Sequence, residues 1–473
     1  MEEIKDFSSE IIEDANQYLS GNSIMFKQDK NKDTYSYNPA PVSLQPSSFS
    51  HEVYCKIREN QTIVNSMIEE LMKNIELIYE FLEPISKVDP FIGSLIKISH
   101  SVRKLPYSQL GYLGVWRTDY MTTEENEVKL VELNTIASGL GFISDKMKGF
   151  YEYLIGKHYS TMNAKNLPED CENTDQIADS MKAAVDLYVA HKQESPKKVI
   201  LAYIVDYTGV TICDQKLIEN ALYFKHKIIS RRLTFSDISE FWELKENGEL
   251  IYKGREEIAV VYYRSGYSPS QYKDKNDWDA RETLEKSLAI KCPNVDLQLL
   301  TFKKIQEVLS KEKNWEKLLG TSDFDNIKGL FKNQMWGFEE IDTETKAIIA
   351  DAKANPDTYV LKTQREGGGN NYFGDDIPYV LEKTEELMNY SLMKKIYPQE
   401  FEGTFLRNNK VYQGKCVSEI GIFGTLLVKT SQDDSREVLI NKGNGFLMRT
   451  KGSNTNEGGV YGGFAFIDFI YFK

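Results

Sequence analysis

The stretch Tyr359-Val-Leu-Lys-Thr-Gln-Arg-Glu-Gly-Gly-Gly-Asn-Asn371 decides how the rest of the sequence is interpreted. Its β-branched and aromatic start predicts a strand over 358–361, with Lys362 at the strand's end. Strand alternation then places Lys362, Gln364 and Glu366 on one face. The glycines that follow let backbone N–H groups approach an anion closely. Lys362 would supply a cation for phosphate, and Glu366 a hard oxygen for Mg²⁺.

The glycine-rich loop on its own has a second interpretation, as an ordinary surface turn. It differs from a P-loop because no Gly-Lys-Ser or Gly-Lys-Thr follows the glycines. Its meaning therefore depends on whether the rest of the chain supplies matching acidic and basic residues.

The composition is that of a globular protein with a large core. The chain has 473 residues, of which 41% are hydrophobic and 27% charged, which predicts about two to four domains. The formal net charge is −13, and no basic stripe is present, so nucleic acid is not an expected partner. An acidic chain that binds anions must gather its Lys and Arg locally.

The five cysteines are scattered and form no CxxC pair. This pattern argues against structural zinc and a disulfide framework, and it indicates a reducing compartment. Residues 1–6 lack an apolar signal region, and no stretch approaches the roughly 18 apolar residues of a membrane span. We therefore expect a cytoplasmic protein without a membrane partner.

Hydrophobic periodicity predicts the elements of the first half. We expect helices over 8–20, from 61 to Pro84, over 91–103, over 145–158 after an N-cap at Ser144, and over 177–191, with an irregular connection over 21–50. A strand over 129–135 would place the Glu132 carboxylate and the Asn134 amide on one face, as Mg²⁺ requires. The alternative is a strand whose outer face is simply polar.

From residue 197 the pattern alternates between strands and helices. We predict strands over 199–205, 227–235 and 258–263, helices over 214–224, 294–309, 338–353 and 378–389, a polar connection over 310–335, a β-hairpin within 411–429, and strands over 437–449 and 464–472. Arg264 directly follows a strand, where open α/β sheets bind ligands. A second glycine-rich loop occupies 456–463.

Several chemistries are excluded by missing motifs. Neither a Gly-x-Ser-x-Gly elbow nor HExxH is present, and Gly139-Leu-Gly141 lacks the third glycine of a dinucleotide fingerprint. What remains is a set of cations (Lys303, Lys362, Arg449, Lys451), acids (Glu132, Glu366, Glu419) and two glycine-rich loops. Such a set fits Mg-nucleotide binding and phosphoryl transfer, where positioning and charge neutralisation dominate catalysis.

The motifs closely resemble those of eukaryotic glutathione synthetases. They are, in the family's order, Glu132-Leu-Asn-Thr135, Ile290-Lys-Cys-Pro293, Lys362 to Asn371, Ser418-Glu-Ile-Gly-Ile-Phe-Gly424, Arg449-Thr-Lys451 and Gly458-Gly-Val460. The resemblance implies an α/β protein with a permuted ATP-grasp fold, a parallel-sheet substrate domain, glycine-rich lid loops and N-terminal scaffold helices. It divides the chain into 1–196, 197–302 and 303–473.

The resemblance also implies a cytosolic homodimer that joins γ-glutamylcysteine to glycine with ATP and Mg²⁺ through an acyl phosphate. It assigns Glu132, Asn134 and Glu366 to the metal. Nucleotide positions are Glu132, Lys303, Lys362, Glu366, Gly367, Gly368, Gly369, Asn370, Asn371, Phe373, Met393, Lys394, Lys395, Ile396, Glu419, Lys451 and Glu457. Substrate positions are Arg117, Ile136, Ala137, Ser138, Gly139, Gln215, Arg264, Tyr267, Arg449, Val460 and Tyr461, with Arg117 and Arg449 as catalytic residues.

The sequence departs from the family pattern at several positions. Thr363, Lys394, Glu457 and Phe373 replace a proline, an acid, an aspartate and a tyrosine. Tyr461 stands where glycine-accepting relatives carry a small residue, so it could reshape the amine pocket. The alternatives are therefore a ligase for another acceptor such as β-alanine or for another γ-glutamyl peptide, and an inactive nucleotide-binding scaffold.

Overall fold

The computed structural model describes most of the chain. The described ranges are 1–28, 35–107, 109–192, 198–206, 209–320, 324–332, 334–339, 341–365, 370–431, 433 and 435–473. No helix in these ranges is both long and apolar enough to cross a membrane.

A long antiparallel hairpin lies at the centre of the fold. Its strands are β18 (Lys410–Thr430) and β19 (Arg436–Gly452), and β6 (Gly111–Thr122) pairs with β18 on its other side. The hairpin predicted within 411–429 is therefore wrong, because this segment is one continuous strand. Gly421 and Gly424 do not form a turn; they lie where neighbouring side chains occupy the space of a Cβ.

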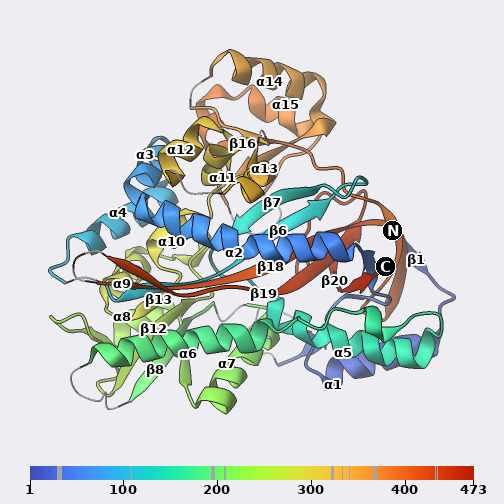
Figure 1. The fold of residues 1–473 in the computed structure, drawn as a ribbon, viewed down its shortest axis with the longest axis horizontal. Coiled ribbons are helices and arrows are strands. Elements are labelled where there is room, and N and C mark those ends of the chain that lie inside the picture. The colour runs from blue at the N-terminus through green and yellow to red at the C-terminus, as the bar shows by residue number, and fades with distance from the viewer. Residues whose placement is uncertain are drawn as a thin grey trace.

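Helices cover both faces of this sheet. The helix α2 (His51–Lys73) packs on β18 and β19 from one side, and α5 (Gly141–His158) and α6 (Asn173–His191) pack from the other (Figure 1). The buried Asn65 joins α2 to the sheet, since it accepts from the Trp116 indole at 2.8 Å and donates to the Lys442 carbonyl at 2.9 Å.

Several helix boundaries differ from the prediction; the helix predicted over 378–389, for example, is divided into an α-helix over Asp376–Leu381 and a 3-10 segment over Thr384–Asn389. The second helix begins at His51, breaks at Asn74 and resumes as α3 (Ile75–Ser86), which contains Pro84 in its last turns. At the break, the Asn74 side chain donates to the Leu318 carbonyl at 2.9 Å. Helix α5 begins at Gly141, so Ser144 is not its N-cap; Asp214 instead accepts from the Leu140 and Ile143 amides at 2.9 and 3.0 Å.

The α/β segment continues the central sheet. Strands β9 (Ile229–Leu233), β8 (Val199–Ile204), β12 (Glu256–Tyr263) and β13 (Ile290–Cys292) run parallel, and β13 pairs with β6. Helix α7 (Ile212–His226) connects β8 to β9. Because the strands are parallel, their carboxyl ends lie at one edge of the sheet, and Arg264 follows β12 there.

A smaller lobe stands apart from the large sheet (Figure 1). Strands β14 (Met335–Trp336), β16 (Tyr390–Lys394) and β15 (Tyr359–Thr363) form its sheet, covered by α14 (Thr343–Ala354) and α15 (Asp376–Leu381). It has a hydrophobic cluster of its own around buried side chains such as Leu361 and Leu392. Lys362, which we predicted at the end of the strand before the first glycine-rich loop, therefore belongs to this lobe.

The remaining elements complete the layers. They are β1 (Glu2–Ile4), α1 (Ser9–Gly21), β2 (Met25–Lys27), β3 (Tyr37–Pro39), β4 (Val42–Ser43), β5 (Ser47–Phe49), α4 (Pro90–Arg103), β7 (Val128–Asn134), α8 (Phe235–Phe241), β10 (Trp242–Leu244), β11 (Leu250–Tyr252), α9 (Lys275–Lys286), α10 (Val295–Leu299), α11 (Lys303–Ser310), α12 (Lys313–Leu319), α13 (Asp325–Phe331), β17 (Phe401–Arg407), β20 (Ala465–Asp468) and β21 (Ile470–Phe472). The single helix over 294–309 and the single strand over 464–472 are each divided in two. The connections predicted over 21–50 and 310–335 contain short strands and helices.

Candidate active site

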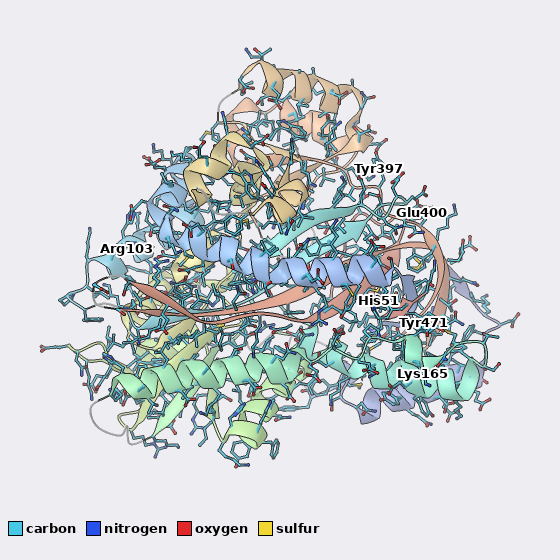
Figure 2. The ribbon with its side chains drawn as sticks, in the orientation of Figure 1. His51, Arg103, Lys165, Tyr397, Glu400 and Tyr471 are labelled. Carbon is cyan, nitrogen blue, oxygen red and sulfur yellow. The ribbon has the colours of Figure 1, made fainter. Side chains whose placement is uncertain are left out.

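A cavity of about 1140 Å³ lies between the small lobe and the central sheet. Figure 2 shows Tyr397 and Glu400, both lining residues, on the chain that crosses from the lobe to β17. Predicted site residues make up much of the wall: Arg117, Glu132, Asn134, Ile136, Ala137, Ser138, Gly139, Gln215, Arg264, Tyr267, Lys362, Asn371, Phe373, Met393, Lys394, Lys395, Ile396, Glu419, Arg449, Lys451, Glu457, Val460 and Tyr461.

Strand register brings the charged residues of distant segments together. The β6–β7 pairing sets Arg117 opposite Asn134 and Asp119 opposite Glu132. The β18–β19 pairing sets Glu419 opposite Arg449. Since β18 also pairs with β6, the metal candidates and the substrate candidates share one continuous sheet surface.

Asp119, which the sequence analysis did not select, is fully buried at the centre of this surface. Its Oδ1 accepts from Arg117 Nε at 2.5 Å. Its Oδ2 accepts from Arg117 Nη2 at 2.7 Å, Asn134 Nδ2 at 2.9 Å and Arg449 Nη2 at 3.0 Å. One available signal was strand alternation, which places Asp119 on the same face as Arg117.

The position of Gly421 in β18 leaves no room for a side chain. A Cβ built there would lie 2.4 Å from both Arg117 Cδ and Asp119 Oδ1. Real Cβ atoms do not approach other atoms so closely, and neither partner can withdraw, because each is held by the contacts just described. The glycine thus makes room for the buried arginine–aspartate pair.

The Glu132 carboxylate is surrounded by cations. Lys303 Nζ lies 3.1 Å from its Oε2. Lys362 comes from the small lobe and donates to the neighbouring Val131 carbonyl at 3.0 Å. Burial alone would raise the pKa of Glu132, but the charges of Lys303, Lys362 and Arg449 outweigh it and lower that pKa well below its usual range. Glu132 is therefore ionised at neutral pH.

The pKa of Glu419, the second acid of the site, is shifted in the opposite direction. Burial raises the pKa of Glu419, and the negative charges of Asp119 and Glu132 raise it further. The contact with the Arg449 guanidinium lowers this pKa but does not outweigh these effects. Although burial lowers the pKa of the Arg449 guanidinium, Glu419 and Asp119 raise it above its usual range. Arg449 thus stays charged between two carboxylates.

The donor set of Glu132 and Asn134 fits a hard divalent cation. The Asn134 amide nitrogen donates to both Asp119 and Glu132, at 2.9 and 3.1 Å. Both neighbours are acceptors, so the amide must present its nitrogen to them and its oxygen elsewhere. A carboxylate and an amide oxygen, with room for phosphate oxygens, match the preference of Mg²⁺. The third predicted ligand, Glu366, lies outside the described residues, as do Gly367, Gly368 and Gly369.

A second part of the cavity is built around Arg264. Its Nη1 donates to the Ser138 carbonyl at 2.5 Å, and Ser138 Oγ donates to the Asn134 carbonyl at 2.8 Å. Arg264 is buried, and among the described residues its Nε has no hydrogen-bond partner. Arg117 Nη1 reaches the same loop through the Gly139 carbonyl at 3.1 Å. Two arginines therefore flank the loop over 136–140.

Tyr461 forms part of the cavity wall, as the resemblance to the family implied. Its ring packs against Phe26 of β2, with centroids 4.7 Å apart, and 41% of the residue remains exposed. The N-terminal strands therefore support one side of the site, a role that the sequence analysis did not assign to residues before 61.

Three predicted residues differ from the rest in placement. Lys303 does not line the cavity and acts through its ion pair with Glu132. Asn370 is also not among the lining residues. Lys394 lines the cavity, but its Nζ lies 3.9 Å from Asp351 and 4.8 Å from the centre of the Tyr359 ring, so its charge is paired within the lobe.

Comparisons with known proteins agree with this geometry. The family model of the eukaryotic glutathione synthase ATP-binding domain matches residues 5–472. The chain is 33% identical over 452 residues to the glutathione synthetase of Dictyostelium discoideum, covering 90% of each chain. It is 33% identical over 448 residues to that of Homo sapiens, covering 92% of this chain and 90% of the relative. It is 32% identical over 441 residues to a chloroplastic glutathione synthetase of Solanum lycopersicum, covering 91% and 77%.

A solved structure shares the fold. The apo form of a glutathione synthetase-like effector from Globodera pallida superposes with a TM-score of 0.70 at 18% identity, covering 98% of this chain and 96% of that one. From the family match and these relatives, we conclude that this chain belongs to the eukaryotic glutathione synthase family.

Proposed function

We propose that this protein is a glutathione synthetase, which uses ATP and Mg²⁺ to join γ-glutamylcysteine to glycine. The observation that carries this proposal is that one cavity gathers the cations for a triphosphate, the oxygens for a metal, and arginines for carboxylates. The lysines come from the small lobe and β19, and the arginines from β6, β19 and the loop after β12.

The nucleotide would lie between the small lobe and the β18–β19 hairpin, in a permuted ATP-grasp arrangement. Lys362 would face phosphate oxygens, and Lys303 would act from outside the cavity through its ion pair with Glu132. Met393 and Lys395 of the β16 region would border the base. Glu132, Asn134 and Glu366 would hold Mg²⁺, which neutralises phosphate charge when bound. The family's ATP dependence supports this half of the site.

The dipeptide and glycine would occupy the part between Arg117, Arg264 and Arg449. Both substrates are carboxylates, and a guanidinium binds a carboxylate through two parallel hydrogen bonds. Among the described residues the Arg264 Nε has no hydrogen-bond partner, so it is one donor available for this purpose. Arg117 and Arg449 would face the reacting carboxylate, where negative charge develops.

The reaction needs no nucleophilic side chain. An oxygen of the cysteinyl carboxylate attacks the γ-phosphorus of ATP, and ADP leaves. The glycine nitrogen, once deprotonated, attacks the resulting acyl carbon, and the phosphate leaves with the bonding electrons. The residues would contribute by aligning the partners, neutralising charge and excluding water from the acyl phosphate.

The proposal also specifies which amine attacks the acyl phosphate, namely glycine. Tyr461 lines the cavity where glycine-accepting relatives carry a small residue, so β-alanine is the competing acceptor. We also propose a cytoplasmic homodimer, and a division of the chain into 1–196, 197–302 and 303–473, by similarity to the family.

The test is an assay of ADP and tripeptide formation with purified protein, ATP, Mg²⁺, γ-glutamylcysteine and either amine. We expect tripeptide and ADP in equal amounts, with a higher kcat/KM for glycine than for β-alanine. Lys362→Met should lower kcat/KM for ATP by roughly 100-fold through loss of a phosphate cation, whereas Lys353→Met, on the exposed surface of α14, should not. The absence of ADP above background would reject the synthetase, and a preference for β-alanine would reject glycine as the acceptor.

A further inference from the structure

We propose that Asp119 is a positioning residue that orients the metal-binding amide of Asn134 and the two substrate arginines through a single buried carboxylate. The inference deepens the proposed function, because it names the residue that joins the metal side of the cavity to the substrate side. Asp119 itself does not line the cavity; it acts from beneath its floor.

The orientation of Asn134 follows from its two neighbours. Its amide nitrogen carries two hydrogens, and Asp119 Oδ2 and Glu132 Oε1 accept one each, at 2.9 and 3.1 Å. If Asp119 were absent, the amide could rotate and present its nitrogen to the cavity, where it would repel a cation. The carboxylate thus fixes the amide oxygen as the ligand atom, as outer-shell partners do in metal sites.

The arginines are fixed by the same group from the other side. Arg117 meets Asp119 through two parallel hydrogen bonds of 2.5 and 2.7 Å, which hold its guanidinium plane. Arg449 adds a bond of 3.0 Å to the oxygen that Asn134 also uses. Nη1 of Arg117 donates to the Gly139 carbonyl in the loop over 136–140. A shift of Asp119 would therefore move both substrate cations and the amide together.

The test uses Asp119→Asn, which keeps the shape but removes the charge and turns one acceptor into a donor. We expect binding of Mn²⁺ with a non-hydrolysable ATP analogue, followed by electron paramagnetic resonance, to weaken by roughly 10- to 100-fold. We also expect a higher KM for γ-glutamylcysteine and a lower kcat. The binding measurement requires no turnover, so it can succeed even if the protein is not a glutathione synthetase.

The control is Asp145→Asn, a half-buried carboxylate of α5 that accepts from the Asn173 and Thr174 amides at the start of α6 and does not line the cavity. This variant should lower the melting temperature and leave metal–nucleotide binding unchanged. If Asp119→Asn also lost only thermal stability, the residue would have a structural role alone and the proposal would be wrong.

A coupling measurement covers the case in which Asp119→Asn folds poorly. Asp119→Glu keeps the charge but displaces it, and should also weaken metal–nucleotide binding. In an Arg449→Lys background, either substitution should lower kcat/KM by a smaller factor than in the wild type, because the contact they share is already weakened. Fully additive effects, or binding equal to the wild type in both variants, would overturn the inference.

Discussion

The Arg117–Asp119 pair depends on a residue that has no side chain. Gly421 faces it across the β6–β18 pairing, and an added methyl would lie 2.4 Å from atoms of both residues. We predict that Gly421→Ala lowers kcat/KM for γ-glutamylcysteine at least about tenfold, because overpacking of about 1–3 kcal/mol is relieved only if Arg117 or Asp119 leaves the contacts that hold it. Steady-state kinetics measure this effect.

The control is Gly156→Ala on the exposed side of α5, where nothing lies within 4 Å of the added Cβ. Alanine there should leave kinetics unchanged and stabilise the fold by about 0.5–1 kcal/mol. Unchanged kinetics in Gly421→Ala would mean that the Arg117–Asp119 pair accommodates the methyl group without loss of substrate binding, contrary to the geometry described.

Residue types and alternation pointed to a few wall residues, including Glu132, Asn134 and Lys362, and the resemblance to the family supplied most of the others. They could not single out Asp119, because its importance lies in contacts across strands. Its Oδ2 accepts from Arg117 of the same strand, Asn134 of β7 and Arg449 of β19. Nor could they show that the Lys394 charge is paired with Asp351, because that contact joins β16 to α14.

At the scale of elements, Asp468 of β20 ties three strands together. Its carboxylate accepts from Ser47 of β5 and Thr450 of β19, both at 2.5 Å, and burial raises its pKa to about 6. A raised pKa means that the folded state favours the protonated acid. Stability from this group is therefore full below its unfolded pKa of 3.8 and is lost as pH rises through about 6.

We predict that Asp468→Asn removes this dependence. The stability of the variant relative to wild type should be greater at pH 7.5 than at pH 5 by on the order of 1 kcal/mol, as measured by urea unfolding. Asp279→Asn on the exposed face of α9 serves as the control and should show the wild-type difference between the two pH values. If the difference in stability between Asp468→Asn and the wild type were the same at both pH values, this would contradict the raised pKa of Asp468.

Elements with strong periodicity were predicted well, such as the helix over 91–103 and the parallel strands after 197. The β18–β19 hairpin was not, because its length exceeds that of common strands and its glycines resemble turn residues. Only the pairing with β6 and the packing of side chains over Gly421 and Gly424 show why the strand continues through them.

For the whole molecule, the cavity between lobe and sheet predicts that nucleotide and metal stabilise the protein together. Mg²⁺ with a non-hydrolysable ATP analogue, at 100 times its Kd, should add about 2.7 kcal/mol and raise the melting temperature by several degrees. EDTA should abolish the rise, and so should Glu132→Gln, which removes a metal ligand. A rise that survives both treatments would place the nucleotide away from Glu132.

In the proposed reaction, the cavity activates a carboxylate by phosphorylation before an amine attacks it. The most direct measurement uses γ-glutamylcysteine with ¹⁸O in its cysteinyl carboxylate, together with ATP, Mg²⁺ and glycine, and follows the inorganic phosphate by mass spectrometry. An acyl phosphate requires one ¹⁸O atom to pass to phosphate in each turnover. Phosphate without ¹⁸O, released while tripeptide forms, would contradict the account.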